Sequence, residues 1–455
     1  MISTIDRICR DQLGFAWWGI APAAPVDHAE ALKTWLDNGL HGEMRWLEEH
    51  IDLRLDPRRV LDNARSMIVV ADRYASREDE PPVPIAVPHR SGRNGEHESP
   101  GILEAGGDAV GRIARYARGE DYHLRLKKRL FRLADALREQ FPNESFRAAV
   151  DTAPILEREH APRAGIAYIG RNTLAIRPGK TSYFFLGELL TTLALPLSEP
   201  MTEDYCKSCR RCVAACPTGA LDQPYTLDAT KCISYLTIEH RTAIDPKYHE
   251  AIGDWIFGCD ICQEVCPHNG GAAQPPAPFS RRAAEAQPHE QAKHGKAGGT
   301  GTGDRSKSWK SERGLPSVPE IYQPRRSGFD LIKLLSWTEE DRRRAFVTSA
   351  LKRAKLDMMK RNAIIAAGNF ILLAKRDGIL RREAIEHTVL TQRQAEKTAA
   401  QPGQAEASNA YARALTAYQL LHRIAALAAD SNEPELVRLT ARDTVDRLAA
   451  GVLPV

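Results

Sequence analysis

The chain has 455 residues, a formal net charge of +4 and 27% charged residues. Its length suits about three domains, and so small a net charge does not by itself indicate nucleic-acid binding. The N-terminus shows no basic leader followed by an apolar core, so we expect no secretory signal. No apolar run approaches the roughly 18 residues of a membrane helix. We therefore expect a cytoplasmic protein without a membrane segment.

The first 200 residues alternate between helix and strand patterns. Helices are predicted over residues 26–38, where Gly39 marks the end, and over residues 109–141. Short buried strands are predicted over residues 66–71, 146–150 and 183–186. This alternation predicts an α/β domain over residues 1–200. Within it, residues 77–107 are rich in proline, glycine and charge and are predicted to form a mobile insertion.

Eight of the nine cysteines lie in two runs between Cys206 and Cys266. The first run reads C-x2-C-x2-C-x3-C-P, and the second lacks its first cysteine, which Cys232 must supply. This is the ligand pattern of two-cluster bacterial ferredoxins, in which the fourth cysteine of a run binds the other [4Fe–4S] cluster. One cluster is therefore expected on Cys206, Cys209, Cys212 and Cys266. The other is expected on Cys216, Cys232, Cys259 and Cys262, which makes residues 201–269 a ferredoxin-like module.

Two other uses of these cysteines fit the sequence less well. A structural zinc site would favour four-cysteine groups without the trailing prolines. Disulfides do not suit a reducing cytoplasm. The ninth cysteine, Cys9, is interpreted as a small hydrophobic residue beside Ile8 and Leu13.

The C-terminal part is predicted to be helical. Residues 270–315 are poor in apolar groups and are predicted to form a disordered insertion. Helical patterns follow at 338–355, 359–374, 380–398, 409–428 and 433–450, the first with Thr338 as its cap. Helix pairs joined by short polar turns favour a HEAT-like region over residues 316–455, with a plain helical bundle as the alternative.

Asp151 is the best candidate for chemistry outside the cysteines. It directly follows a predicted strand, a position where sheet proteins often place their sites. Gly165 and Gly170 farther along would allow the backbone to approach a large ligand closely. The alternative is that Asp151 caps a helix around Leu156. The residues alone leave both interpretations open.

The succession of motifs resembles the epoxyqueuosine reductase family, cobalamin-dependent iron–sulfur enzymes that complete queuosine in tRNA. The resemblance runs along nearly the whole chain. Beside the cysteine runs it is carried by Gly42-Glu43-Met44, Asp52-Leu-Arg54-Leu-Asp56-Pro57, Asp121-Tyr122-His123, Asp151-Thr-Ala-Pro-Ile-Leu-Glu-Arg158, Gly170-Arg-Asn172-Thr173, Tyr183-Phe-Phe-Leu-Gly-Glu188, Cys232-Ile-Ser-Tyr-Leu-Thr237 and Arg361-Asn-Ala363.

The resemblance implies a corrinoid held between the α/β domain and the cluster module. It implies that Asp151 is the proton donor near the cobalt, with a pKa raised by burial. Arg54, Leu186, Ser234 and Asp260 match blocks that contact cobalamin in relatives; the alternative for Arg54 is a surface ion pair with Asp52 or Asp56. Roles for Tyr122 and His123 stay open, and Ala114 stands where some relatives carry a cysteine.

The implied activity is the reduction of epoxyqueuosine to queuosine at the wobble position of tRNAs with GUN anticodons, by a monomer that takes electrons from an external low-potential donor. A reductive-dehalogenase-like corrinoid enzyme and a non-catalytic electron carrier are the alternatives. Basic groups that could contact tRNA phosphates, or form ordinary solvated faces, are Lys127-Lys128-Arg129, Arg342-Arg-Arg344, Lys352-Arg353 and Lys360-Arg361.

Overall fold

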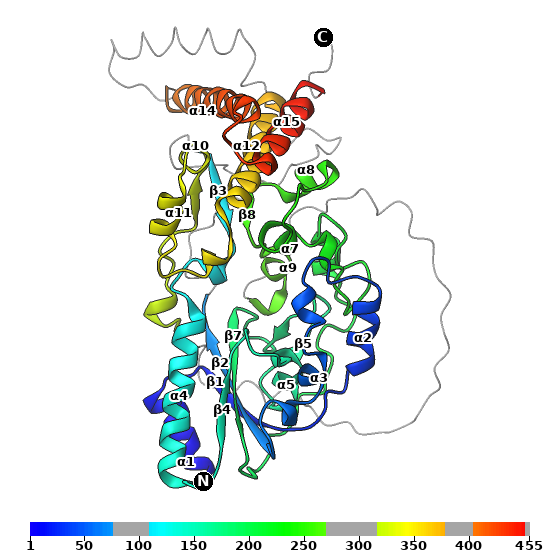
Figure 1. Ribbon diagram of the computed structural model, residues 1–455, viewed down its shortest axis with the longest axis vertical. Coiled ribbons are helices and arrows are strands. Elements are labelled where there is room, and N and C mark those ends of the chain that lie inside the picture. The colour runs from blue at the N-terminus through cyan, green and yellow to red at the C-terminus, as the bar shows by residue number, and fades with distance from the viewer. Residues whose placement is uncertain (76–108, 270–315, 378–403, 451–455) are drawn as a thin grey trace.

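The structure, a computed structural model, describes residues 1–75, 109–269, 316–377 and 404–450, the side chains of 404–411 and 450 excepted. A four-stranded sheet dominates the part of the chain drawn at the bottom of Figure 1, with strand order β1-β2-β7-β4. Its strands are β1 (Trp17–Pro22), β2 (Ser66–Arg73), β4 (Phe146–Ala149) and β7 (Phe184–Thr191).

All neighbouring strands of this sheet are antiparallel. The helices and strands do alternate along the chain, but an α/β fold in the strict sense has parallel strands, so that part of the prediction is wrong. The physical reason is that β2 pairs with β7, which lies far away in the sequence, rather than with a strand reached by a helical crossover.

Helices cover both faces of the sheet: α1 (Ile2–Arg7) and α4 (Tyr122–Gln140) lie on one face and α5 (Glu157–Arg163) on the other (Figure 1). The side chains of β2 alternate between the two cores. Ile68 and Val70 pack on the α4 side, and Met67 and Val69 on the α5 side. Cys9 is fully buried in the α4-side core, as predicted.

The predicted strand at 66–71 is confirmed as part of β2. The helix predicted over 26–38 is α2 (Ala29–Asp37), and its predicted end at Gly39 is confirmed. Helix α3 (Ile51–Leu55) follows it. The single long helix predicted over 109–141 is wrong. Its first part forms strand β3 (Val110–Ile113), because those residues find partners in a second sheet. Helix α4 begins only after Asp121, whose side chain accepts the amide of His123.

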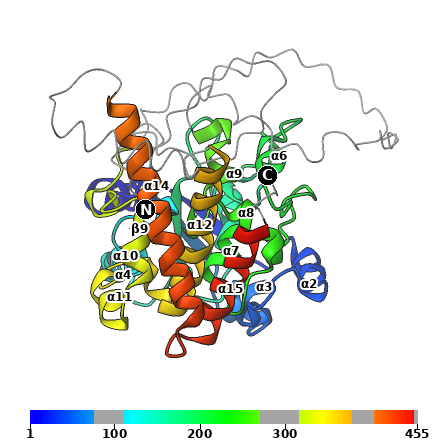
Figure 2. The same ribbon diagram turned by 90° about the horizontal axis from the view of Figure 1, so that it is seen from above.

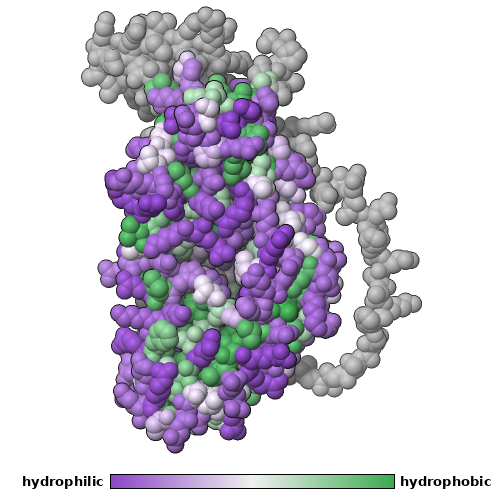
Figure 3. Space-filling view, in the orientation of Figure 1, coloured by the Kyte–Doolittle hydropathy of each residue, from purple (hydrophilic) through white to green (hydrophobic). Residues whose placement is uncertain are grey.

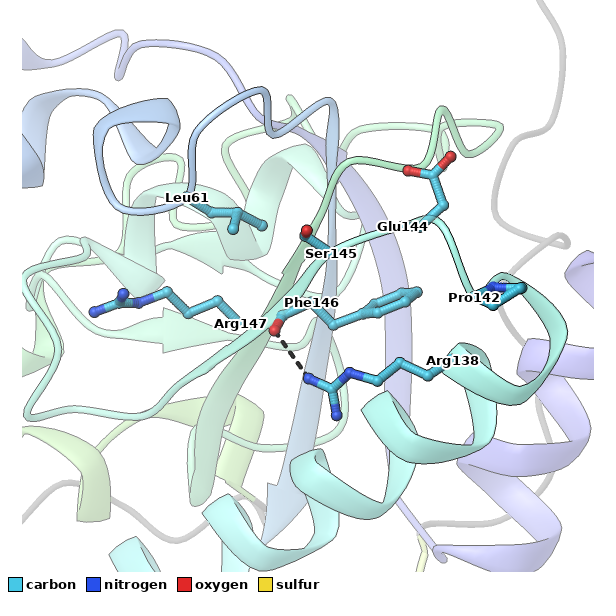
Figure 4. A pocket seen from close by; sticks show the side chains of 7 residues that line it. All are labelled: Leu61, Arg138, Pro142, Glu144, Ser145, Phe146 and Arg147. Carbon is cyan, nitrogen blue, oxygen red and sulfur yellow. Dashed lines mark hydrogen bonds between the residues drawn. The ribbon is translucent and has the colours of Figure 1, made fainter.

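The outer edge of the first sheet is β4. Arg138 of α4 donates to the carbonyl oxygen of Phe146 at 3.2 Å (Figure 4). This bond satisfies one of the backbone groups that an edge strand leaves free. A shallow depression of about 620 Å³ lies beside it, lined by Leu61, Arg138, Pro142, Glu144, Ser145, Phe146 and Arg147 (Figure 4).

A second sheet, ordered β8-β3-β9, joins three distant parts of the chain. Strand β3 pairs in parallel with β8 (Trp255–Phe257) and antiparallel with β9 (Gly328–Asp330). The cysteine-bearing region around it contributes α6 (Arg211–Ala215), α7 (Ile233–Ile238), α8 (His249–Ile252) and α9 (Ile261–Glu264). A short hairpin of β5 (Tyr168–Ile169) and β6 (Ala175–Ile176) lies beside the first cysteine run, through contacts of Tyr168 with Cys206.

The C-terminal part contains strand β9 and, from Leu331 onward, is mainly helical where it is described. Its helices are α10 (Leu331–Leu335), α11 (Glu339–Ala345), α12 (Leu356–Arg376), α14 (Gln404–Ala429) and α15 (Glu435–Ala450). Thr338 caps α11 with a reciprocal bond from Asp341, as predicted. The helix predicted over 338–355 is shorter, because the chain turns after Ala345 before a 3₁₀ segment. Helices α12, α14 and α15 pack against one another (Figure 2).

The predicted HEAT-like arrangement stays a prediction. The predicted helix at 380–398 and the predicted insertions at 77–107 and 270–315 lie outside the described residues. No helix of the described ranges is long and apolar enough to cross a membrane. The face drawn in Figure 3 is mostly hydrophilic.

Helix α12 attaches the helical region to the cluster module through buried polar side chains. Arg361, fully buried, donates to the carbonyl oxygens of Leu236, His240 and Thr242 at 2.6–2.7 Å. Asn362 donates to two more carbonyls of that module, each at 2.8 Å. Lys360 is buried against Glu433. Lys360 and Arg361 are therefore structural, and the expectation that they contact tRNA is wrong.

Candidate active site

A cavity of about 450 Å³ lies between the first sheet and the cysteine-bearing region, and it measures about 1570 Å³ with the open space at its mouth. Four of the predicted site residues line it, although they come from distant parts of the chain. These are Asp151 after β4, Leu186 on β7, Ser234 on α7 and Asp260 before α9. Four cysteines also line it: Cys216, Cys232, Cys259 and Cys262.

The other four cysteines of the two runs line a separate small space. Cys206, Cys209, Cys212 and Cys266 line a cavity of about 30 Å³. Burial, together with the neighbouring thiols of Cys206, Cys212 and Cys209, raises the pKa of Cys266 to about 12. No three His, Cys, Asp or Glu side chains in the described ranges stand close enough to hold a single metal ion. Each group instead encloses a space, as the thiolates of a cluster do.

The loop around Asn172 links the two groups of cysteines. The amide of Arg171 and the hydroxyl of Tyr168 each lie 3.5 Å from Cys206 Sγ. Asn172 lines both cavities and donates to the carbonyl oxygen of Cys262 at 3.5 Å. Amide and hydroxyl groups aimed at cluster sulfurs tune their potential. The residues between Gly170 and Thr173 thus serve the cysteines as well as the large cavity.

Asp151 makes two side-chain contacts with the start of α4. Its Oδ2 accepts from the Tyr122 hydroxyl at 3.0 Å and lies 2.8 Å from Nε2 of His123. The other ring nitrogen of His123 lies 2.7 Å from Asp121. Asp151 does not cap α5, whose N-cap is Leu156 without a side-chain bond. The capping alternative is therefore wrong.

Among Asp151, Tyr122 and His123, the proton that Asp151 and His123 could share resides on His123. Burial raises the pKa of Asp151, but the hydrogen bond and charge of His123, with the Tyr122 hydroxyl, outweigh it and leave the pKa below its ordinary value. Burial lowers the pKa of His123, but its bonds to Asp121 and Asp151 raise it to about 9. At neutral pH the pair is therefore an imidazolium beside a carboxylate. The expectation that the pKa of Asp151 is raised is wrong, because sequence reasoning did not place His123 beside it.

Asp260 is almost fully buried and accepts the amide of Arg115 at 2.7 Å, with the Arg115 guanidinium 3.7 Å away. It fixes the turn that carries Cys259 and Cys262. Gly258, at φ 72°, permits this turn, and a Cβ there would come within 2.6 Å of Ala114. Ala114 itself lines the cavity.

Arg54 is not among the described residues that line the cavity. It is buried, donates to the carbonyl oxygen of Trp46 at 3.1 Å and lies over the Trp46 ring at 5.4 Å. The ion pairs suggested as its alternative are not formed, since Asp56 binds Arg58 and Asp52 binds Arg59. The negative charge of Glu157, which does line the cavity, acts on the Arg54 guanidinium.

Aromatic rings form a wall of the cavity that sequence reasoning missed. Tyr122 stacks on Phe185 with ring centroids 3.9 Å apart and on His123 at 4.0 Å. Tyr74 also packs against Phe185, with ring centroids 4.5 Å apart. Phe185 belongs to a motif that carries the family resemblance. The sequence of that motif does not say which face of the sheet the Phe185 ring occupies, because this depends on the pairing of β7 with β2.

Comparison with known proteins agrees with this geometry. Residues 54–152 match the family model described as epoxyqueuosine reductase QueG, and residues 205–269 match the 4Fe-4S double cluster binding domain. The epoxyqueuosine reductase of Pseudomonas aeruginosa is 33% identical over 360 residues, which cover 79% of this chain and 82% of that protein. The chain belongs to the epoxyqueuosine reductase family.

Other members of the epoxyqueuosine reductase family support this assignment. The Cyclobacterium marinum enzyme is 38% identical over 259 residues, covering 57% of this chain and 76% of that protein. A crystal structure of epoxyqueuosine reductase with an epoxyqueuosine-modified tRNA stem loop shares the fold, with a TM-score of 0.65, 22% identity and coverage of 98% of this chain and 99% of that chain.

Proposed function

We propose that this chain reduces epoxyqueuosine to queuosine in tRNA, using two [4Fe–4S] clusters and cobalamin. Family membership supports the activity. The observation that carries the proposal is the cavity itself, which is lined by Asp151 and by four cysteines, with His123 2.8 Å from the Asp151 carboxylate. That arrangement suits a reaction that needs electrons from one side and a proton from the other.

The cysteines fit the crossed ligand assignment. Cys206, Cys209, Cys212 and Cys266 would hold the outer cluster. Cys216, Cys232, Cys259 and Cys262 would hold the inner cluster, at the wall of the large cavity. An external low-potential donor would thus deliver electrons at the outer cluster, and the inner one would pass them to the cavity.

The large cavity fits a corrinoid. Phe185 and Leu186 contribute apolar lining for the flat ring system, Ser234 contributes a hydroxyl and Asp260 a buried carboxylate. When bound, the corrinoid would supply a nucleophilic cobalt and the clusters its electrons. Arg54 lies outside the cavity lining, so its predicted contact with the cofactor stays a prediction.

The proton needed by the departing epoxide oxygen would come from Asp151. In net terms the epoxide, two electrons and two protons give the cyclopentene and water. Asp151 is ionised at rest, so its proton must come from His123, which lies 2.8 Å away and has a pKa of about 9. The Tyr122 hydroxyl holds the shared oxygen in place at 3.0 Å. His123 is thus the proton store and Asp151 the group that delivers the proton.

The expected tRNA substrates are those with GUN anticodons, bound by a cytoplasmic monomer. Exposed cations suited to the phosphate backbone are Lys127, Lys128, Arg343, Arg344 and Lys352. Arg129 is not one of them, because it binds Asp72 and the carbonyl oxygen of Leu13.

Anaerobic reconstitution with iron, sulfide and cobalamin tests the proposal. The loaded protein should show the visible spectra of both cofactors. With a chemical reductant it should convert epoxyqueuosine in tRNA to queuosine, read by mass spectrometry of the digested tRNA. Protein that binds both clusters but no cobalamin would instead favour a non-catalytic electron carrier.

A further inference from the structure

The backbone at Asp151 is held in a conformation that side chains disfavour. Its φ is 42°, in the left-handed region where a Cβ crowds the following carbonyl group. Asp151 stands in the short loop between β4 and α5, whose neighbouring residues turn tightly, with the Thr152 amide donating to the carbonyl oxygen of Val150. A strained residue persists only where its surroundings hold it.

The Asp151 backbone makes a hydrogen bond with a side chain of helix α5. Its peptide N–H donates to Oε1 of Glu157 at 2.5 Å. Glu157 is the first residue of α5, so its carboxyl is anchored by a helix that packs on the sheet. The proposed mechanism uses the Asp151 side chain and gives Glu157 no role.

The surroundings of Glu157 favour its neutral acid form, in which it still accepts the hydrogen bond from the Asp151 amide. Burial raises its pKa, and the negative charges of Glu188 and Asp151 raise it further. Glu188 is itself fully buried and bound to Nδ1 of His160 at 2.9 Å. The charged and titratable groups that face Glu157 are Asp151, Glu188, Arg54, Arg158 and Tyr122.

We propose that Glu157 is a positioning residue whose carboxyl holds the Asp151 loop in the strained conformation that presents Asp151 to His123 and to the cavity. Without that acceptor, the Asp151 amide loses its partner and the backbone is free to relax to a negative φ. Such relaxation turns the side chain away from His123 and Tyr122. The predicted effect on turnover rests on the proposed function, whereas the predicted effect on His123 does not.

The test uses the full-length protein with both clusters loaded. Glu157→Ala removes the acceptor, while Glu157→Gln keeps a carbonyl oxygen at the same reach and mimics the neutral acid. Glu159→Gln, on the same helix but bound to His28 and Arg163, is the matched control. With cobalamin bound, we expect kcat of Glu157→Ala to fall roughly 10- to 100-fold, the scale of a misplaced catalytic group. KM for tRNA and iron content should stay unchanged, and Glu157→Gln should keep most of the turnover.

The second readout needs no turnover. The pKa of His123 is measured by NMR of histidine-labelled protein without cobalamin, with His123→Asn used to assign its signal. In Glu157→Ala the pKa should fall toward its ordinary value, because Asp151 no longer faces the ring; Glu157→Gln and Glu159→Gln should leave it raised. Failure of the wild-type protein to reduce epoxyqueuosine would overturn the proposed function and leave this readout valid.

Two results would overturn the positioning role. One is Glu157→Ala with normal turnover and an unchanged His123 pKa, which would show that the side-chain contacts alone hold the loop. The other is Glu157→Gln as impaired as Glu157→Ala, which would mean that the ionisable proton rather than the acceptor oxygen matters. If Glu157→Ala fails to fold, Glu157→Asp withdraws the acceptor by one methylene and keeps the acid; it should show the same losses.

Discussion

Replacing Asp151 by asparagine isolates its proton from its other contacts. Asparagine has nearly the same size, tolerates a positive φ and keeps the amide bond to Glu157. It removes the negative charge beside His123, 2.8 Å away. General-acid help is commonly worth about 100- to 10,000-fold. The Asp151 side chain is 53% exposed, so water can replace part of its action. We therefore expect turnover to fall at the lower end of that range, roughly 100-fold.

The assay is conversion of epoxyqueuosine to queuosine, followed by mass spectrometry of digested tRNA. Both clusters and cobalamin should bind normally, as seen in their visible spectra. The pKa of His123 should also fall below about 9, because one of its two carboxylate partners has lost its charge. Asp135→Asn, which changes an exposed carboxylate on α4, is the control. Near-normal turnover in Asp151→Asn would refute the reasoning and show that another group protonates the oxygen. Loss of cobalamin binding would show a structural role instead.

Three further outcomes follow from the structure. Cys232→Ala should reduce the iron content from about eight to about four atoms per chain, because only the inner cluster loses a ligand; full iron content would contradict the crossed assignment. Reversing the charges of Arg343 and Arg344 should weaken tRNA binding and flatten its salt dependence by about one unit of slope for each lost phosphate contact. Reversing the charge of Arg147, in the depression beside β4, should do neither. An unchanged slope in the Arg343 and Arg344 variant would place the RNA surface elsewhere. The pKa of His123 is raised from 6.5 to about 9, so its proton is present below that pH and lost above it. Turnover should therefore fall as the pH rises through about 9. A rate that is constant to pH 10 would exclude His123 as the proton store.

Local sequence was sufficient wherever the chemistry depends on spacing. The cysteine runs indicated two four-cysteine groups because cluster ligands must follow one another at short intervals, and each predicted group lines one cavity. The cap at Thr338 and the end of α2 at Gly39 could also be predicted, because both depend on a few neighbouring residues. The motif resemblance identified Asp151.

Tertiary packing decided what the neighbours of each group are. Residues 110–113 are predicted to be helical but form a strand, because β8 and β9 offer them backbone partners. Arg361 reads as a surface cation but is buried against three carbonyl groups. The protonation state of Asp151 depends on His123, which lies 28 positions away in the sequence. The sequence by itself determined which groups the protein carries; their charges depend on distances between remote segments, which only the folded chain sets.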